Sequence, residues 1–74
     1  MINFLPNKKL RILYENHRGE RNWRNVKFRE LYWGKTEYHP DPGFLMSTYD
    51  LDKKEVRELS CKHIEEIQLP GTNT

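Results

Sequence analysis

The sequence predicts a mainly β protein, folded as a small antiparallel barrel of five strands. Short runs in which apolar and polar residues alternate recur at spacings of about 8–15 residues, as in small all-β domains. The chain has 74 residues, so we expect one domain, over residues 10–69. Because only 35% of the residues are hydrophobic, aromatic side chains must supply much of its core.

The first two strands are expected over residues 10–16 and 21–29, joined as a hairpin. The apolar residues that share one face of the first strand, at a period of two, are Leu10, Ile12 and Tyr14. Gly19 lies between the two runs and permits the positive φ that a tight turn requires. The second run alternates in the same way, which completes the prediction of a hairpin.

The next stretch, residues 30–33, is either a third strand or a sharp bend of the second. Gly34 is expected to end it, because glycine adopts backbone angles that other residues avoid. A polar loop follows over residues 35–43, in which Pro40 and Pro42 fix φ and bias the preceding residues toward extended conformations. We therefore expect this loop to be ordered.

Two further strands are expected over residues 44–50 and 55–59. The first is the strongest strand signal in the chain and should be central in the sheet. The polar residues 51–54 separate the two runs and predict a turn. These strands should therefore form a second hairpin.

The last predicted element is a strand over residues 64–69, preceded by a short helical turn near residues 60–63. Ser60 is expected to cap this turn, because a serine side chain accepts hydrogen bonds from backbone donors at a helix start. A longer helix over residues 60–69 is the alternative, since part of the run has helical spacing. We favour the strand because Ile67 fits the apolar face of such a helix poorly.

The ends of the chain and its single cysteine bear on the cellular setting. Residues 1–9 are expected to be a lead-in segment, and residues 70–74 a disordered tail. Cys61 excludes an intramolecular disulfide and suggests a reducing compartment. No segment approaches the roughly 18 apolar residues of a membrane span, and no signal peptide is recognisable. We therefore expect a cytoplasmic protein without a membrane partner.

The charges are unevenly distributed along the chain. Residues 1–29 hold eight Lys and Arg against two Glu, whereas residues 30–74 hold five against nine acidic residues. These halves interleave in a folded barrel, so the asymmetry does not by itself predict a basic face. It does favour an anionic partner more than the net charge of +2 suggests.

Four segments together resemble a known family. They are ILYENHRGE from residue 12, WRNV from residue 23, FLMSTYD from residue 44 and VRELSCKHIEEI from residue 56. Their order and spacing resemble a WYL domain, a small Sm-like or SH3-like barrel, over residues 10–69. Phe44, Leu45 and Met46 replace the Trp-Tyr-Leu triplet of that family, and the loop after Gly34 is longer than usual. This loop is similar to that of short, stand-alone bacterial or phage proteins.

The resemblance implies a ligand site. Carried over position by position, its candidate contacts are Arg24, Tyr49 and Arg57, with His63 standing where an arginine is usual. WYL domains are implicated in binding nucleic acids or nucleotides and in regulating transcription factors and defence systems. Arginine suits a phosphate because its planar fork donates two parallel hydrogen bonds. The alternative is that Arg24 and Arg57 pair with carboxylates inside the sheet, namely Asp50, Glu55 or Glu58.

A second candidate surface is one face of the strand over residues 21–29. It carries basic residues broken by an aromatic one, a pattern suited to stacking bases and contacting phosphates. These residues are Arg21, Trp23, Asn25, Lys27 and Arg29. The alternative is an ordinary solvated face, because Lys and Arg are usually exposed. Tyr32 and Tyr38 could also stack bases if exposed, whereas Trp33 is expected to pack in the core.

Metal binding and catalysis find little support in the sequence. The candidate zinc ligands are His17, His39, Cys61 and His63, but their spacing matches no common zinc finger. No glycine-rich phosphate loop and no nucleophile elbow occurs in the chain. We therefore expect no metal, no cofactor and no enzymatic activity.

The predicted function is a non-enzymatic, WYL-like regulatory module that contacts single-stranded nucleic acid or a nucleotide. The chain shows no helix-turn-helix, so regulation must act through a partner, a ligand or direct nucleic-acid contact. The alternative is a protein-interaction module, a phage or mobile-element factor that alters a host regulator or defence protein. The unusual loop from His39 to Pro42 motivates it, and His39 is a candidate contact in either case.

Overall fold

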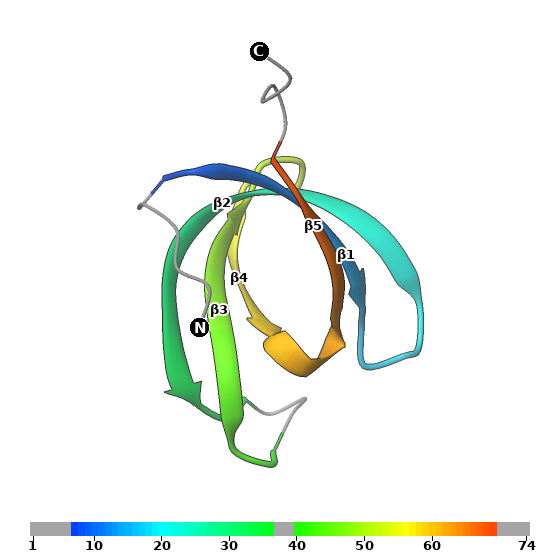
Figure 1. Ribbon diagram of the computed structural model, residues 1–74, viewed down its shortest axis with the longest axis vertical. Helices are drawn as coiled ribbons and strands as arrows, with labels where there is room; N and C mark the ends of the chain where they lie inside the picture. The colour runs from blue at the N-terminus through cyan, green and yellow to red at the C-terminus, as the bar shows by residue number, and fades with distance from the viewer. Residues whose placement is uncertain (1–6, 37–39, 70–74) are drawn as a thin grey trace.

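The structure, a computed structural model, describes residues 7–36 and 40–69 (Figure 1). Its elements, in chain order, are β1 (Lys9–Glu15), β2 (Arg21–Gly34), β3 (Gly43–Asp50), β4 (Glu55–Ser60), the 3-10 turn η1 (Cys61–His63) and β5 (Ile64–Gln68). The predictions made for residues 1–6 and 70–74, for His39 and for Tyr38 lie outside the described residues. The described residues contain no helix long and apolar enough to cross a membrane.

All five strands belong to one antiparallel sheet in the order β4-β3-β2-β1-β5. This confirms the expected mainly β fold with five antiparallel strands. The sheet curls strongly, and η1 connects its two edge strands, β4 and β5 (Figure 1). However, no backbone pairing joins β4 to β5 within residues 7–36 and 40–69. The sheet is therefore not closed, and the barrel that we expected is not shown.

The strand β2 is long because residues 30–33 continue it. Its first half pairs with β1 and its second half with β3, with a shift of register between Phe28 and Glu30. Such a bulge inserts an extra residue, here Arg29, and bends the strand. Of the two alternatives for this stretch, the bend of the second strand is thus the one observed, and β2 ends at Gly34 as expected.

The core lies on the inner, concave face of the sheet. It consists of residues at alternate positions of four strands: Leu10, Ile12, Tyr14, Val26, Phe28, Met46 and Leu59. The period-two prediction for the first strand is confirmed, since its three apolar residues are all buried. Leu31, Cys61, Ile64 and Ile67 pack against this cluster from its margins.

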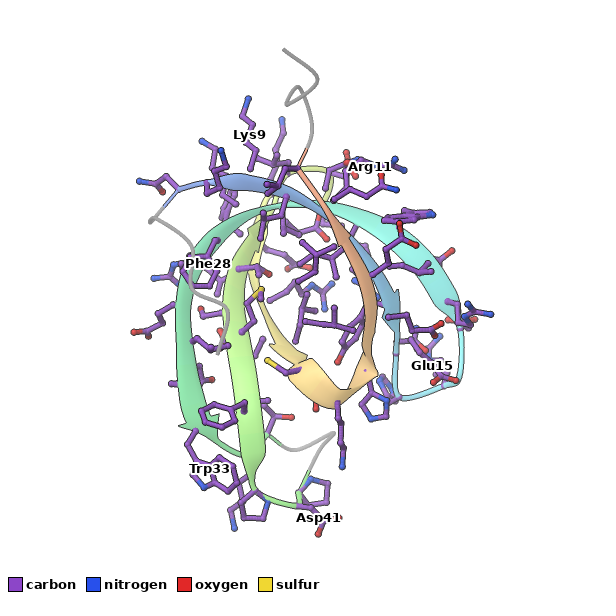
Figure 2. All side chains as sticks on the ribbon, in the orientation of Figure 1. Lys9, Arg11, Glu15, Phe28, Trp33 and Asp41 are labelled. Carbon is purple, nitrogen blue, oxygen red and sulfur yellow. The ribbon has the colours of Figure 1, made fainter. Side chains whose placement is uncertain are left out.

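The prediction that Trp33 packs in the core is wrong. Its side chain is 63% exposed, and Figure 2 shows it at the opposite end of the molecule from Lys9. The reason lies in the register of the strands. The pairing of β1 with β2 reaches only to Lys27, so the far end of the β2–β3 hairpin extends beyond the core.

Two turns and the 3-10 segment complete the fold. Gly19 has a φ of 83°, as expected for the first hairpin. In the turn after β3, Asp50 accepts hydrogen bonds from the backbone N–H groups of Asp52 and Lys53, both at 2.9 Å. The expected cap at Ser60 is wrong, because its side chain makes no capping hydrogen bond. Its backbone N–H instead donates to the hydroxyl of Tyr14 at 2.9 Å.

Candidate functional site

A cavity with a volume of about 570 Å³ lies between the tip of the β1–β2 hairpin and strand β4. Its volume is in the range of roughly 300–1,000 Å³ typical of small-molecule sites. The lining residues are Tyr14, Asn16, His17, Arg18, Glu20, Arg24, Thr36, Lys53, Val56, Arg57, Glu58 and Leu59. The cavity therefore brings together residues that are up to 45 positions apart in the sequence.

The cavity runs along the edge of β4. Four consecutive residues of this strand, from Val56 to Leu59, all line it. Since successive side chains of a strand point to opposite faces, four in a row can border one cavity only along the strand's edge. In the sheet, β4 is an edge strand with β3 as its one neighbour. The site is therefore the open margin of the curled sheet.

Arg24 reaches the cavity from the inner face of β2. It lies opposite Ile12 of β1, and directly opposed residues of two paired strands share a face. Its guanidinium carbon lies 5.4 Å from the centroid of the Tyr14 ring, in cation–π geometry. Its Nε is buried and has no hydrogen-bond partner. The alternative that Arg24 pairs with a carboxylate inside the sheet is not observed among the described residues.

Tyr14, beneath Arg24, is held as a neutral side chain. Burial raises the pKa of its phenol, an effect that the hydrogen bond from the Ser60 backbone and the charge of Arg24 reduce but do not cancel. The ring therefore gives Arg24 an uncharged, fixed surface at physiological pH. His63, in η1, contacts the same ring edge-on, with the ring centroids 6.4 Å apart.

Arg57 reaches the cavity from β4. It forms an ion pair with the carboxylate of Glu55, two residues earlier on the same strand, so pairing within the sheet is observed here. The side chains of both partners are about half exposed, which limits the strength of such a pair to at most about 1 kcal/mol. The Nε of Arg57, like that of Arg24, is buried without a hydrogen-bond partner. Arg57 thus keeps an unused donor.

The charge lining the cavity is predominantly positive. Its lining residues include four cationic ones, Arg18, Arg24, Lys53 and Arg57, and two acidic ones, Glu20 and Glu58. Both carboxylates accept hydrogen bonds from neutral groups. Glu20 accepts one from the amide of Asn16 at 2.9 Å, and Glu58 accepts from two hydroxyls. The negative charges that share the cavity are therefore not bound to its arginines.

Two of the expected contacts lie elsewhere. Tyr49 is directly opposite Lys27 on β2 and Val56 on β4, which places it on the outer face, whereas Arg24 and Arg57 belong to the inner face. His63 does not line the cavity; its Nδ1 lies 4.0 Å from a carboxylate oxygen of Glu15. The structure thus brings Arg24 and Arg57 together and separates Tyr49 from them.

The basic stripe, which we define as Arg21, Trp23, Asn25, Lys27 and Arg29, lies on the outer face of β2. Several of its members have partners within the sheet. Arg21 pairs with Glu65 at 2.7 Å, Arg29 donates to the hydroxyl of Ser47 at 3.3 Å, and Arg11 stacks on Trp23 at 4.6 Å. Trp23 also borders a second, smaller cavity of about 270 Å³ together with Arg24.

Sequence reasoning missed Arg18 and Lys53 as members of the site. Both lie in turns, Arg18 between β1 and β2 and Lys53 between β3 and β4. Their basic character is visible in the sequence, but their proximity depends on how the two hairpins are placed. Glu58 was considered only as a possible partner of the arginines, and its hydroxyl contacts were not foreseen.

The described residues contain no group of three or more His, Cys, Asp or Glu side chains placed to hold a metal ion. Burial raises the pKa of the Cys61 thiol, so this cysteine is held as a thiol rather than as the more reactive thiolate. Comparisons of the chain with models of protein families, with curated proteins and with solved structures found no match. The resemblance to WYL domains therefore stays a prediction.

Proposed function

We propose that the protein is a non-enzymatic, regulatory binding module that holds a phosphate-bearing ligand in the cavity beside β4. The ligand would be a nucleotide or a phosphate of a single-stranded nucleic acid. The observation that carries this proposal is that Arg24 and Arg57, 33 positions apart, line one cavity, each with a buried and unpartnered Nε. These are also two of the contacts that the resemblance to WYL domains implies.

A phosphate fits the donors of this cavity. A buried donor without a partner costs roughly 1–3 kcal/mol, and a phosphate oxygen would remove that cost. Hydrogen bonds from guanidinium groups to phosphate are shorter and stronger than neutral ones. Arg18 and Lys53 add positive charge at the rim, where they would attract an anion.

The test is a titration of the purified protein with inorganic pyrophosphate, with AMP and with a labelled single-stranded oligonucleotide. We expect binding that weakens as the salt concentration rises from about 20 to about 300 mM, because phosphate contacts release counterions. Arg57→Gln and Arg24→Gln should each weaken binding by about tenfold or more, in line with the loss of a charged hydrogen bond.

Arg21→Gln is the matched control, because it removes the same charge from the outer face of the same strand as Arg24. It should change affinity by less than about twofold. If the wild-type protein bound none of the three probes at low salt, the proposal would be abandoned. If Arg21→Gln weakened binding as much as Arg57→Gln, the basic stripe would be the site instead of the cavity.

A second candidate function, the protein-interaction module, is favoured by one observation. Trp33 and Phe44 form an edge-to-face pair with ring centroids 5.2 Å apart, and their side chains are 63% and 40% exposed. They lie at the end of the β2–β3 hairpin, beside the exposed Pro40 and Pro42. Exposed aromatic clusters of this kind are frequent in protein interfaces.

This candidate is tested by a pull-down with the double substitution Trp33→Ser and Phe44→Ser. Capture of a specific partner by the wild-type protein and its loss in this variant would support the second candidate. Val56→Ser serves as the control, since Val56 is also exposed but lies on β4. Equal capture by all three proteins would remove the aromatic pair from the mechanism.

A further inference from the structure

The carboxylate of Glu58 is held by a set of hydroxyl groups that spans three strands. The side chain lies on β4, and its two oxygens accept hydrogen bonds from the hydroxyl of Tyr32 on β2 at 2.6 Å and from that of Ser47 on β3 at 3.1 Å. Ser47 in turn accepts a hydrogen bond from Arg29 at 3.3 Å. These contacts direct the Glu58 carboxylate across the outer face, toward the middle of the sheet.

This placement matters because Glu58 follows Arg57 directly and both residues line the cavity. A carboxylate without these hydroxyl partners would be free to pair with a cation, either with Arg29, which contacts Ser47 on the outer face, or with the arginines and Lys53 that line the same cavity. Pairing with the cavity's cations would neutralise charge that an anionic ligand needs and would satisfy the free donor of Arg57. The hydroxyls therefore compete with the arginines for one carboxylate.

We propose that Tyr32 and Ser47 are positioning residues of the cavity, whose hydroxyls hold the Glu58 carboxylate on the outer face and so keep Arg24 and Arg57 available to an anionic ligand. This inference rests on the proposed binding of a phosphate-bearing ligand. It adds residues from the opposite face of the sheet to the site. It also assigns them a role that does not involve contact with the ligand.

The chemistry of Tyr32 supports this role. The hydrogen bond to Glu58 is the main cause that raises the pKa of Tyr32 to about 12. The shift reflects the same contact that the geometry shows, in which the protonated hydroxyl donates to the Glu58 carboxylate.

The test is a set of variants titrated with inorganic pyrophosphate. Tyr32→Phe removes the hydroxyl and keeps the ring. We expect it to weaken binding by about fivefold, because the released Glu58 carboxylate would compete with the ligand for the partly exposed arginines. Ser47→Ala, which removes the weaker contact, should have the same effect to a smaller degree. Tyr49→Phe is the matched control and should bind as the wild type, because Tyr49 lies on the same face without a contact to Glu58.

The decisive comparison uses Glu58→Gln. In this background, Tyr32→Phe should no longer change affinity, because the charge that Tyr32 positions is gone. The proposal is overturned if Tyr32→Phe binds as Tyr49→Phe does, or if its loss of affinity persists beside Glu58→Gln. A failure of the proposed function is distinguishable, since Arg57→Gln would then also leave affinity unchanged.

A second measurement does not depend on the ligand. Exchange of the Arg57 Nε–H with solvent can be followed by NMR in the folded protein. It should slow in Tyr32→Phe, as Glu58 becomes a partner of this donor, and stay unchanged in Tyr49→Phe. Equal exchange rates in both variants would contradict the inference even if no probe bound.

Discussion

The two faces of β2 carry similar residues and use them differently. On the outer face, Arg21 pairs with Glu65 and Arg29 contacts Ser47, so two arginines of the basic stripe have partners on other strands. On the inner face, Arg24 lies over an aromatic ring with an unpartnered Nε, and Arg57 joins it from the edge of the sheet. The inner face is the concave one and ends at an open edge.

This difference shows that the basic residues of the two faces are distinguished by the partners of their donors. The stripe has the stronger sequence signal, because its basic residues alternate along a single strand. Of the three arginines that line the cavity, Arg24 and Arg57 keep free donors in a partly enclosed space, where each hydrogen bond to an anion is worth more. Experiments that treat the two faces in parallel will test the distinction.

The largest difference should come from reversing two charges on each face. Arg24→Glu with Arg57→Glu should weaken pyrophosphate binding by more than about 100-fold, because two donors are replaced by repelling carboxylates. Arg21→Glu with Lys27→Glu makes the same change of net charge on the outer face and should weaken pyrophosphate binding by less than about threefold. Isothermal titration calorimetry measures both, with circular dichroism as the check of folding. Equal losses of affinity in the two double variants would show that the two faces do not differ in anion binding.

The next largest effect concerns stability on the cavity side. Asp50 is buried and accepts two backbone hydrogen bonds in the turn that leads into β4. Asp50→Ala should lower the free energy of unfolding by about 1–3 kcal/mol, because these donors lose their partner. Asp52→Ala, at an exposed position of the same turn, should cost less than about 0.5 kcal/mol. Urea denaturation separates these outcomes, and similar values for both would show that Asp50 does not hold the turn.

A smaller effect is expected at high pH. The pKa of Tyr32 is raised from 10.0 to about 12, so the folded protein holds this proton more tightly than the unfolded chain does. The resulting stabilisation is complete below pH 10 and is lost as the pH rises toward 12. Glu58→Gln should return the pKa of Tyr32 toward 10, which the ultraviolet absorbance of tyrosinate reports. An unchanged titration in Glu58→Gln would remove the carboxylate as the cause.

The smallest effect should follow Glu65→Gln on the outer face. The side chains of Arg21 and Glu65 are 58% and 36% exposed, and such pairs contribute less than about 1 kcal/mol. We expect the free energy of unfolding to fall by less than about 0.5 kcal/mol and the affinity for oligonucleotides to stay unchanged. A clear gain of oligonucleotide affinity would indicate that Glu65 masks a nucleic-acid surface on the stripe.

Much of the fold was predictable from local patterns. The alternation in residues 10–16 and 44–50, the glycine at position 19 and the preference for a strand after a short turn at residue 60 all correspond to observed elements. These features depend on residues close in the sequence, because side chains of a strand alternate and turns require particular backbone angles. Arg24 and Arg57 became candidates in a different way, through the resemblance to WYL domains rather than through a local pattern.

The arrangement of the site required the pairing of distant strands. Tyr49 belongs to the same set of candidates as Arg57, yet the register of β3 with β4 places the two side chains on opposite faces. Trp33 is a large aromatic residue of the kind that fills cores, but the pairing of β1 with β2 begins at Lys9, opposite Lys27, and does not reach this side chain. The residues close to a position in the sequence do not determine where a partner strand begins or ends, so neither outcome could be predicted from them.

The sequence therefore established the strands, the turn chemistry and the supply of basic and aromatic side chains, since these follow from local spacing and residue type. Strand order and register settled which of those side chains share the concave face. They also settled which carboxylates lie within reach and where the sheet stays open beside β4. The physical reason is that a binding site depends on distances between residues far apart in the chain, and only the folded sheet sets those distances.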